Sequence, residues 1–202
     1  MNTITKKYET NFREKGSKFT GILFSCESDE AFAKNLAEIK ATYPDASHHC
    51  YAWRVNPNNI KEFSSDDGEP SGTAGLPILN QLKSFEVVNV GAVVVRYFGG
   101  TKLGKSGLIE AYGLATKLCL NEADLLSIIP VQLFEIRYSY PEENLVNKLI
   151  NSYDLSVQGS EYLASVRLKV ACPKEKAKTL EKELSGLSHL SISFTKLEEA
   201  YI

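Results

Sequence analysis

The hydrophobic pattern is most regular in the last part of the chain, after Pro130. Residues 131–139 alternate between apolar and polar side chains, which is typical of a strand with one buried face. Two later segments carry apolar residues at three- and four-residue spacing, and each opens at a proline, a residue that suits the first turn of a helix. The pattern predicts the order β-α-β-β-α-β, with strands at 131–139, 155–157, 162–170 and 190–194 and helices that open at Pro141 and Pro173.

This order is that of a ferredoxin-like domain. Glycines support two of its boundaries. Gly159-Ser160, between the middle strands, predicts a hairpin turn, and Gly186 suits the end of the second helix. We therefore expect residues 130–202 to form a ferredoxin-like βαββαβ domain.

The pattern before residue 130 is less regular and mixes strands with helices. Apolar or alternating runs predict strands at residues 18–26, 47–55 and 87–98. Helical spacing predicts helices at residues 28–43, 78–85 and 106–122. Ser28 suits the N-cap of the first helix, and a long loop occupies residues 64–77. We expect residues 1–129 to form one domain with a partly antiparallel sheet, so that the whole chain belongs to the α+β class.

Composition narrows the class of protein without indicating a function. Of the 202 residues, 43% are hydrophobic and 24% charged, which is typical of a soluble globular protein. No apolar run approaches the roughly 20 residues that span a membrane, and the N-terminus lacks the apolar segment of a signal peptide. The four cysteines are far apart, which favours reduced thiols in a cytoplasmic protein. A net charge of −2 gives no global attraction for nucleic acids.

Residues 99–106, GGTKLGKS, match the P-loop pattern G-x-x-x-x-G-K-[ST], between a predicted strand and a predicted helix. The rest of a nucleoside triphosphatase is missing. No later apolar strand ends in an aspartate that would hold the metal ion, and the ferredoxin-like unit occupies most of the chain that follows. We therefore expect these glycines to form a tight strand-to-helix turn, with Lys105 in solvent.

Longer motifs resemble the YigZ/IMPACT family. They are KGSKF at residues 15–19, PDASHHCYAWR at 44–54, SSDDGEPSGTAGLP at 64–77, RYFGGTKLG at 96–104 and AYG at 111–113. The resemblance covers the whole first domain, and the two-domain layout is similar to that of the bacterial members. It implies a first domain with the left-handed βαβ fold of ribosomal-protein S5 domain 2. It also implies a second domain similar to the ferredoxin-like domains of elongation factor G, which agrees with the pattern of residues 130–202.

The resemblance also bears on the P-loop pattern and on function. In relatives the positions of Lys105 and Ser106 vary, so the Lys-Ser pair looks like a local feature of this chain. Glu110 stands where many relatives carry arginine, which argues against a phosphate contact from that part of the helix. Eukaryotic IMPACT proteins, which resemble this chain in the first domain only, regulate translation through an additional N-terminal domain. The fold analogy points to RNA, the ribosome or a translation factor as partner.

The glycine turn supplies the first group of candidate binding residues. Cations, an aromatic ring and backbone N–H groups lie together there, and such a patch binds an RNA backbone even on a neutral protein. The alternative is an ordinary solvated surface. The candidates are Arg96, Tyr97, Gly99, Gly100, Lys102 and Gly104, with Lys105, Lys15 and Lys18 as neighbours.

The acidic loop supplies the second group. Asp66, Asp67 and Glu69 form either a Mg²⁺ or acid–base site or a solvated turn. The segment 71–75 forms either a backbone nest for an anion or a plain loop. The candidates in that segment are Ser71, Gly72, Thr73 and Gly75.

His48 and Cys50 project from the same face of a predicted strand, and His48 is also a candidate binding residue. Their Cα atoms lie about 6–7 Å apart in a strand, which makes a direct nucleophile–base pair awkward, so a buried Cys50 is favoured. Tyr51 and Trp53 either stack on bases or pack in the core.

We expect a cytoplasmic, non-enzymatic protein that binds RNA, the ribosome or a translation factor, with no membrane partner. The alternative is a phosphate-ligand or nucleotide-binding enzyme that uses the loop from Asp66 to Gly75 with Mg²⁺.

Overall fold

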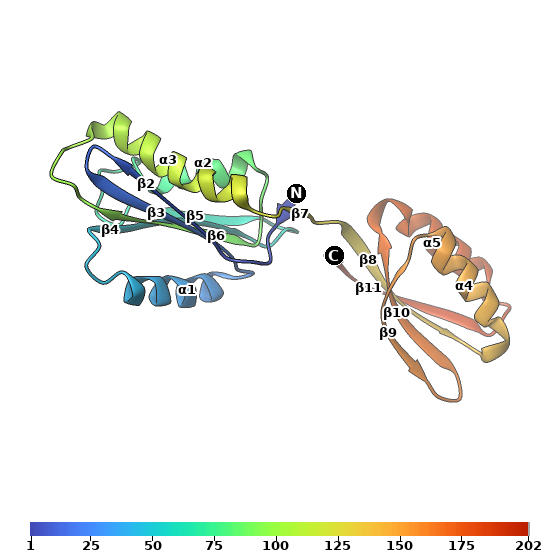
Figure 1. Ribbon diagram of the computed structural model, residues 1–202. Helices are drawn as coiled ribbons and strands as arrows, with labels where there is room; N and C mark the ends of the chain where they lie inside the picture. Colours follow the sequence, from blue (N-terminus) through green and yellow to red (C-terminus); the bar gives the residue numbers. More distant parts are fainter. Residues whose placement is uncertain (202) are drawn as a thin grey trace. The chain divides into compact units, whose positions relative to one another are not determined.

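The computed structural model describes residues 1–201, and the chain divides into two compact units. The first unit is Met1–Ser127 and the second begins at Ile128. The sequence pattern places the boundary two residues later, after residue 129. Each unit has its own sheet and its own core (Figure 1).

The sheet of the first unit has five strands in the order β2-β3-β6-β4-β5, and every neighbouring pair is antiparallel. The strands are β2 (Tyr8–Glu14), β3 (Ser17–Ser25), β4 (His48–Val55), β5 (Lys61–Ser65) and β6 (Val90–Tyr97). The central strand β6 is buried along almost its whole length because it is rich in valine and is covered on both faces. Both β3 and β4 run antiparallel to β6, so they are parallel to each other and form a βαβ unit with the helix between them.

Helices cover both faces of this sheet (Figure 1). They are α1 (Asp29–Thr42), α2 (Gly75–Ser84) and α3 (Gly104–Glu122). On one face, α2 and α3 pack against the sheet in a core that includes Phe19 and Tyr112. On the other face, α1 packs through Phe32 and Ile39. Ser28 caps α1 as predicted, since its Oγ accepts a hydrogen bond of 3.1 Å from the Ala31 N–H.

A two-stranded ribbon joins the ends of the first unit. It pairs β1 (Asn2–Thr3) with β7 (Leu126–Ser127) in antiparallel register. The start of the chain is thereby tied to the segment that leads into the second unit.

The second unit is the predicted ferredoxin-like domain. Its antiparallel sheet has the order β11-β8-β10-β9, and two helices cover one face. The elements are β8 (Pro130–Tyr138), η1 (Tyr140–Glu142), α4 (Glu143–Ser152), β9 (Ser156–Tyr162), β10 (Val166–Pro173), α5 (Lys174–Gly186) and β11 (Ile192–Tyr201). The fold class expected from the sequence is confirmed for both units.

One turn was predicted in the wrong place. Gly159-Ser160 lies inside β9, and the hairpin turns instead at residues 163–165, where the Leu163 N–H donates to the Ser165 carbonyl. Every residue of β9 is exposed because it is an edge strand with a polar sequence. With no buried face there is no alternation, so the glycine was the stronger local signal. Among residues 1–201, the structure has no helix long and apolar enough to cross a membrane.

Candidate functional site

The turn between β6 and α3 spans residues 98–103 and depends on its glycines. Gly99 lies against the hairpin turn between β2 and β3, and a Cβ added at Gly99 would fall 1.9 Å from the carbonyl carbon of Gly16. Gly100 and Gly104 have φ angles of +87° and +74°, which favour glycine. The strand–turn–helix arrangement expected for the P-loop-like segment is therefore present, and its glycines serve the turn itself.

The N-terminus of α3 is positive and open. No side chain caps it, and its first turn contains no acidic residue. Lys102 and Lys105 are exposed on either side of it, and neither makes a hydrogen bond or ion pair with any residue in the described range. Unpaired N–H groups of a first helical turn and two free ammonium groups together attract an anion.

This turn and the acidic loop meet in one cleft of about 360 Å³, which we call the cationic cleft. Two residues of the acidic loop line one side of it, and the glycine turn with the start of α3 lines the other. The lining residues are Glu69, Pro70, Arg96, Phe98, Lys102, Leu103, Gly104, Lys105 and Leu108.

Arg96 and Glu69 form a buried ion pair at the floor of the cationic cleft. Their side chains are 6% and 4% exposed, and the Arg96 Nη1 donates to the Glu69 Oε1 at 2.5 Å. The Tyr112 hydroxyl donates to the same oxygen at 2.8 Å, and the His48 Nε2 lies 3.8 Å away from it. The charge of Glu69 is therefore balanced inside the protein, and the two exposed lysines dominate the cleft.

Other contacts hold the Arg96 guanidinium in place. Its Nη2 donates to the Ser17 Oγ at 3.3 Å, and the ring centroids of Phe19 and Phe98 each lie 5.5 Å from its Cζ atom. The Arg96 Nε is buried without a hydrogen-bond partner in the described part of the chain. Phe98 is half exposed and Tyr97 is partly buried, so an aromatic ring stands at the mouth of the cleft.

Asp66 fills the predicted anion nest from within the chain. Its carboxylate accepts hydrogen bonds from the N–H groups of Gly72, Ala74 and Gly75 at 2.8, 3.0 and 2.8 Å, at the N-terminus of α2. Burial by itself would raise the pKa of the Asp66 carboxyl, but the three N–H donors outweigh it and lower the pKa. The reading of residues 71–75 as a nest for an external anion is corrected, because those donors already have an anion. Thr73 is buried and its hydroxyl donates to the Pro70 carbonyl, while Ser71 is exposed.

The three carboxylates of the acidic loop do not converge on a common point. Asp67 accepts the His49 N–H at 2.7 Å and pairs with Lys40, while Asp66 and Glu69 have the separate partners described above. Within residues 1–201, no group of three or more His, Cys, Asp or Glu side chains is arranged to hold a metal ion. Each of the three carboxylates therefore contacts groups of the chain itself.

The residues of β4 alternate between the two faces of the sheet, as the sequence pattern predicts. Cys50 is buried and its Sγ donates to the Asp66 carbonyl at 2.9 Å, and burial raises the pKa of the thiol to about 12. The His48 Nδ1 lies 2.8 Å from the Asp67 carbonyl, so His48 contacts the acidic loop rather than Cys50. On the opposite face, Tyr51 and Trp53 pack near Phe32 beneath α1.

Sequence reasoning missed two members of this network, Ser17 and Tyr112. Both are fully buried, and both contact residues far away in the chain. Ser17 lies in the motif KGSKF and Tyr112 in the motif AYG, but neither motif gave these two residues a role. No local pattern distinguishes a buried tyrosine that donates to a carboxylate from one that only packs.

Two family models match the chain. The Impact N-terminal domain matches residues 15–120, and a domain of unknown function, DUF1949, matches residues 136–189. These ranges fall within the first and second unit, respectively.

Individual proteins are similar over most of the chain. The IMPACT family member YigZ of Escherichia coli K12 is 35% identical over 187 residues, which cover 92% of each protein. A crystal structure of a hypothetical protein has a TM-score of 0.67 at 32% identity and covers 98% of this chain and 97% of its own. A protein IMPACT homolog of Saccharomyces cerevisiae is 33% identical over 96 residues, 45% of this chain and 36% of the yeast protein.

Proposed function

The chain belongs to the IMPACT family, and on this premise we propose that it is a non-enzymatic protein that acts in translation by holding an RNA phosphate backbone in its cationic cleft. Eukaryotic IMPACT proteins, which it resembles in the first unit, regulate translation. Ribosomal RNA is the most extensive phosphate surface in that process, and we take the ribosome as the partner to test.

The open N-terminus of α3 in the cationic cleft is the observation that carries this proposal. At α2 the equivalent N–H groups are satisfied by Asp66, whereas at α3 no side chain caps them and Lys102 and Lys105 flank them. Backbone phosphates are the anions that such a combination of N–H donors and ammonium groups recognises. The half-exposed Phe98 ring adds a surface on which a base can stack.

Glu110, which stands where many relatives carry arginine, does not oppose a phosphate in the cationic cleft. Glu110 lines a different pocket and is absent from the lining of the cationic cleft. Lys102 and Lys105 therefore face a phosphate without a competing free carboxylate in the cleft, since Glu69 is paired with Arg96.

The enzyme alternative has no support in the side chains of the acidic loop. Asp66, Asp67 and Glu69 are engaged by the chain's own N–H groups and cations. Cys50 holds its proton at neutral pH because its pKa is about 12. A phosphate contact by lysines and a helix N-terminus needs none of these groups to react.

The test is a binding titration of the full chain against purified ribosomes and against a single-stranded RNA, at several salt concentrations. We expect the affinity to fall with salt, and the Lys102→Ala/Lys105→Ala variant to bind more weakly. For single-stranded RNA, the loss of two phosphate contacts reduces the slope of log K against log salt by about 1.4.

Lys117→Ala is the matched control, because Lys117 is an exposed lysine of the same helix that lies outside the cationic cleft. It should bind like the unchanged protein. If the unchanged protein binds neither probe, or if the double variant and the control bind equally well, the proposal is wrong.

A further inference from the structure

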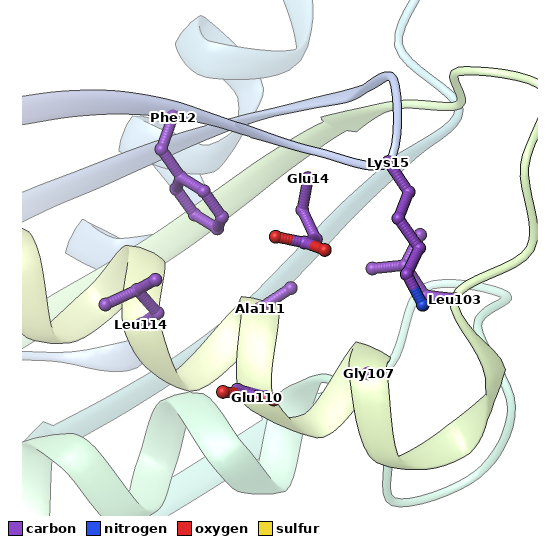
Figure 2. Close-up of a pocket in the computed structure, with 8 residues that line it drawn as sticks. All are labelled: Phe12, Glu14, Lys15, Leu103, Gly107, Glu110, Ala111 and Leu114. Atoms are coloured by element: carbon purple, nitrogen blue, oxygen red, sulfur yellow. The ribbon is translucent and has the colours of Figure 1, made fainter.

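A second pocket lies on the other side of the first turns of α3, and it differs in character from the cationic cleft. Its volume is about 180 Å³. Figure 2 shows three of its residues coming from β2 and the turn that follows, and five coming from the start of α3 and the residue before it. We call it the acidic pocket, and its lining residues are Phe12, Glu14, Lys15, Leu103, Gly107, Glu110, Ala111 and Leu114.

Apolar side chains form part of the lining of the acidic pocket, beside the charged groups of Glu14, Lys15 and Glu110. Leu103 and Ala111 are buried, and Phe12 lines the pocket while its ring stacks on Phe19 at 5.1 Å between centroids. Leu114 is 41% exposed, although it is a large apolar residue. Gly107 carries no side chain, and a Cβ there would approach the Leu103 Cβ to 3.1 Å. An occupant with an apolar stem therefore finds contact along the interior.

The charges of the acidic pocket come from opposite sides. Glu14 lies at the end of β2 and Glu110 lies on α3, and both are exposed (Figure 2). Neither carboxylate has a hydrogen bond or ion pair with any residue from 1 to 201. Lys15, in the hairpin turn, is the single cation of the lining and is likewise unpaired there. Two free carboxylates against one free ammonium group leave the pocket with a net negative charge.

Size restricts what this pocket holds. Cavities for drug-sized ligands begin at about 300 Å³, so a pocket of about 180 Å³ suits one side chain better than a whole small molecule. A side chain with an apolar stem and a cationic head matches both its interior and its charge. Arginine matches better than lysine, because its planar guanidinium donates to two carboxylates at once and packs against an aromatic ring.

We propose that the acidic pocket is a docking site for an arginine side chain presented by a basic segment of a partner protein. The stem lies along Phe12, Ala111 and Leu114, and the guanidinium donates to Glu14 and Glu110. Arginine is enriched among the residues that contribute most to the binding energy of protein interfaces. The site goes beyond RNA binding and stands without it, since it shares only Leu103 with the cationic cleft.

The experiment follows the backbone N–H signals of the full chain by NMR during titration at constant ionic strength. The probes are capped five-residue peptides of glycine with one central arginine, lysine or glutamine. We expect the arginine peptide to shift the signals of Glu14, Gly107 and Ala111 in a saturable way, the lysine peptide to bind more weakly, and the glutamine peptide to have no effect. Equal binding of all three peptides, or no shifts at these positions, overturns the proposal.

Variants separate the contact from the fold. Exposed ion pairs are worth up to about 1 kcal/mol, so Glu14→Gln and Glu110→Gln should each weaken binding of the arginine peptide by about two- to fivefold. Lys15→Asn removes the competing cation and should strengthen binding of the arginine peptide. Asparagine tolerates the φ of +46° at this position. A general loss of structure would weaken peptide binding in all three variants, so it cannot explain a gain of affinity in Lys15→Asn.

Glu122→Gln is the matched control, because it removes an exposed glutamate at the far end of the same helix. It should leave peptide binding unchanged, and equal weakening by Glu122→Gln would overturn the proposal. RNA binding provides an independent readout. Neither Glu14→Gln nor Glu110→Gln should weaken RNA binding, so failure of the peptide test and failure of the RNA test are distinguishable.

Discussion

At the scale of single residues, Asp66 and Glu69 show how two carboxylates of one loop take different roles. Asp66 accepts three backbone N–H groups and so caps α2, whose N-cap residue Ala74 has no capping side chain. Glu69 is buried and balances the charge of Arg96, with Tyr112 as a second donor. Burial of these groups is tolerable because each has hydrogen-bond partners. The carboxylates of the acidic loop thus hold the loop in place. The free charges of the cationic cleft are therefore those of its two lysines.

Asp66→Ala should destabilise the first unit by about 1–2 kcal/mol, the usual cost of losing a helix cap. Because folding lowers the pKa of Asp66, its contribution is complete above the unfolded pKa of about 3.9 and is lost as the pH falls through the folded pKa. Urea unfolding at several pH values measures the difference between the two proteins, which should shrink as the solution becomes more acidic.

Asp45→Ala is the control for this prediction, because Asp45 is exposed and has no partner within residues 1–201. Its midpoint should match that of the unchanged protein at every pH. If the difference in urea midpoint between the Asp66→Ala protein and the control stayed constant down to strongly acidic pH, the capping role would be contradicted.

At the scale of elements, the turn between β6 and α3 depends on the close approach of the β2–β3 hairpin. Gly99 and Gly16 touch through their backbones, and the Gly99 N–H donates to the Ser17 Oγ at 3.2 Å. This contact brings the walls of both pockets together, since the hairpin contributes Glu14 and Lys15 to one pocket and the turn contributes Lys102 to the other. The glycine pattern therefore serves the placement of α3 rather than nucleotide binding.

Gly99→Ala should destabilise the first unit by about 3 kcal/mol, the upper end of the usual cost of overpacking, because the new methyl group meets backbone that has no room to move. Gly100→Ala is the matched control. Its Cβ would meet nothing within 4 Å, so only the left-handed φ of +87° opposes it, at a cost of about 1–2 kcal/mol. Denaturant midpoints compare the two, and an equal loss from both would show that the contact with Gly16 is not needed.

At the scale of the whole molecule, the chain consists of two units with separate cores. One pair of apolar clusters lies on the two faces of the first sheet, and the other pair lies on the two faces of the second sheet. The cationic cleft and the acidic pocket are both lined only by residues of the first unit. We infer that binding belongs to the first unit and that the second unit is not required for it.

Residues 1–127, expressed alone, should fold and bind RNA with the same affinity and salt dependence as the full chain. The cut after Ser127 keeps the pairing of β1 with β7. Circular dichroism during heating and a filter-binding titration provide the measurements, with residues 128–202 as a control that should fold without binding. Loss of cooperative unfolding in the first fragment, or an affinity that returns only with the second unit, would show that the two units act together.

The sequence by itself determined the second unit and most helices of the first, since these follow from local periodicity. Apolar residues at positions such as Val146, Leu149 and Leu180 repeat at helical spacing, and Ser28 marks a helix start, without reference to any distant residue. Alternation failed for β5 and β9, which are edge strands with no fully buried residue. A strand without a buried face carries no period of two.

Only the tertiary structure decided what the candidate residues do. It places the Asp66 carboxylate in the nest, joins Glu69 to Arg96 and Tyr112, and brings Glu14 opposite Glu110. Each of these contacts joins side chains that no helical or strand period relates. A free lysine and a paired carboxylate look alike in the sequence because the difference lies in the partner, and the partner is chosen by the way the sheet and its helices pack.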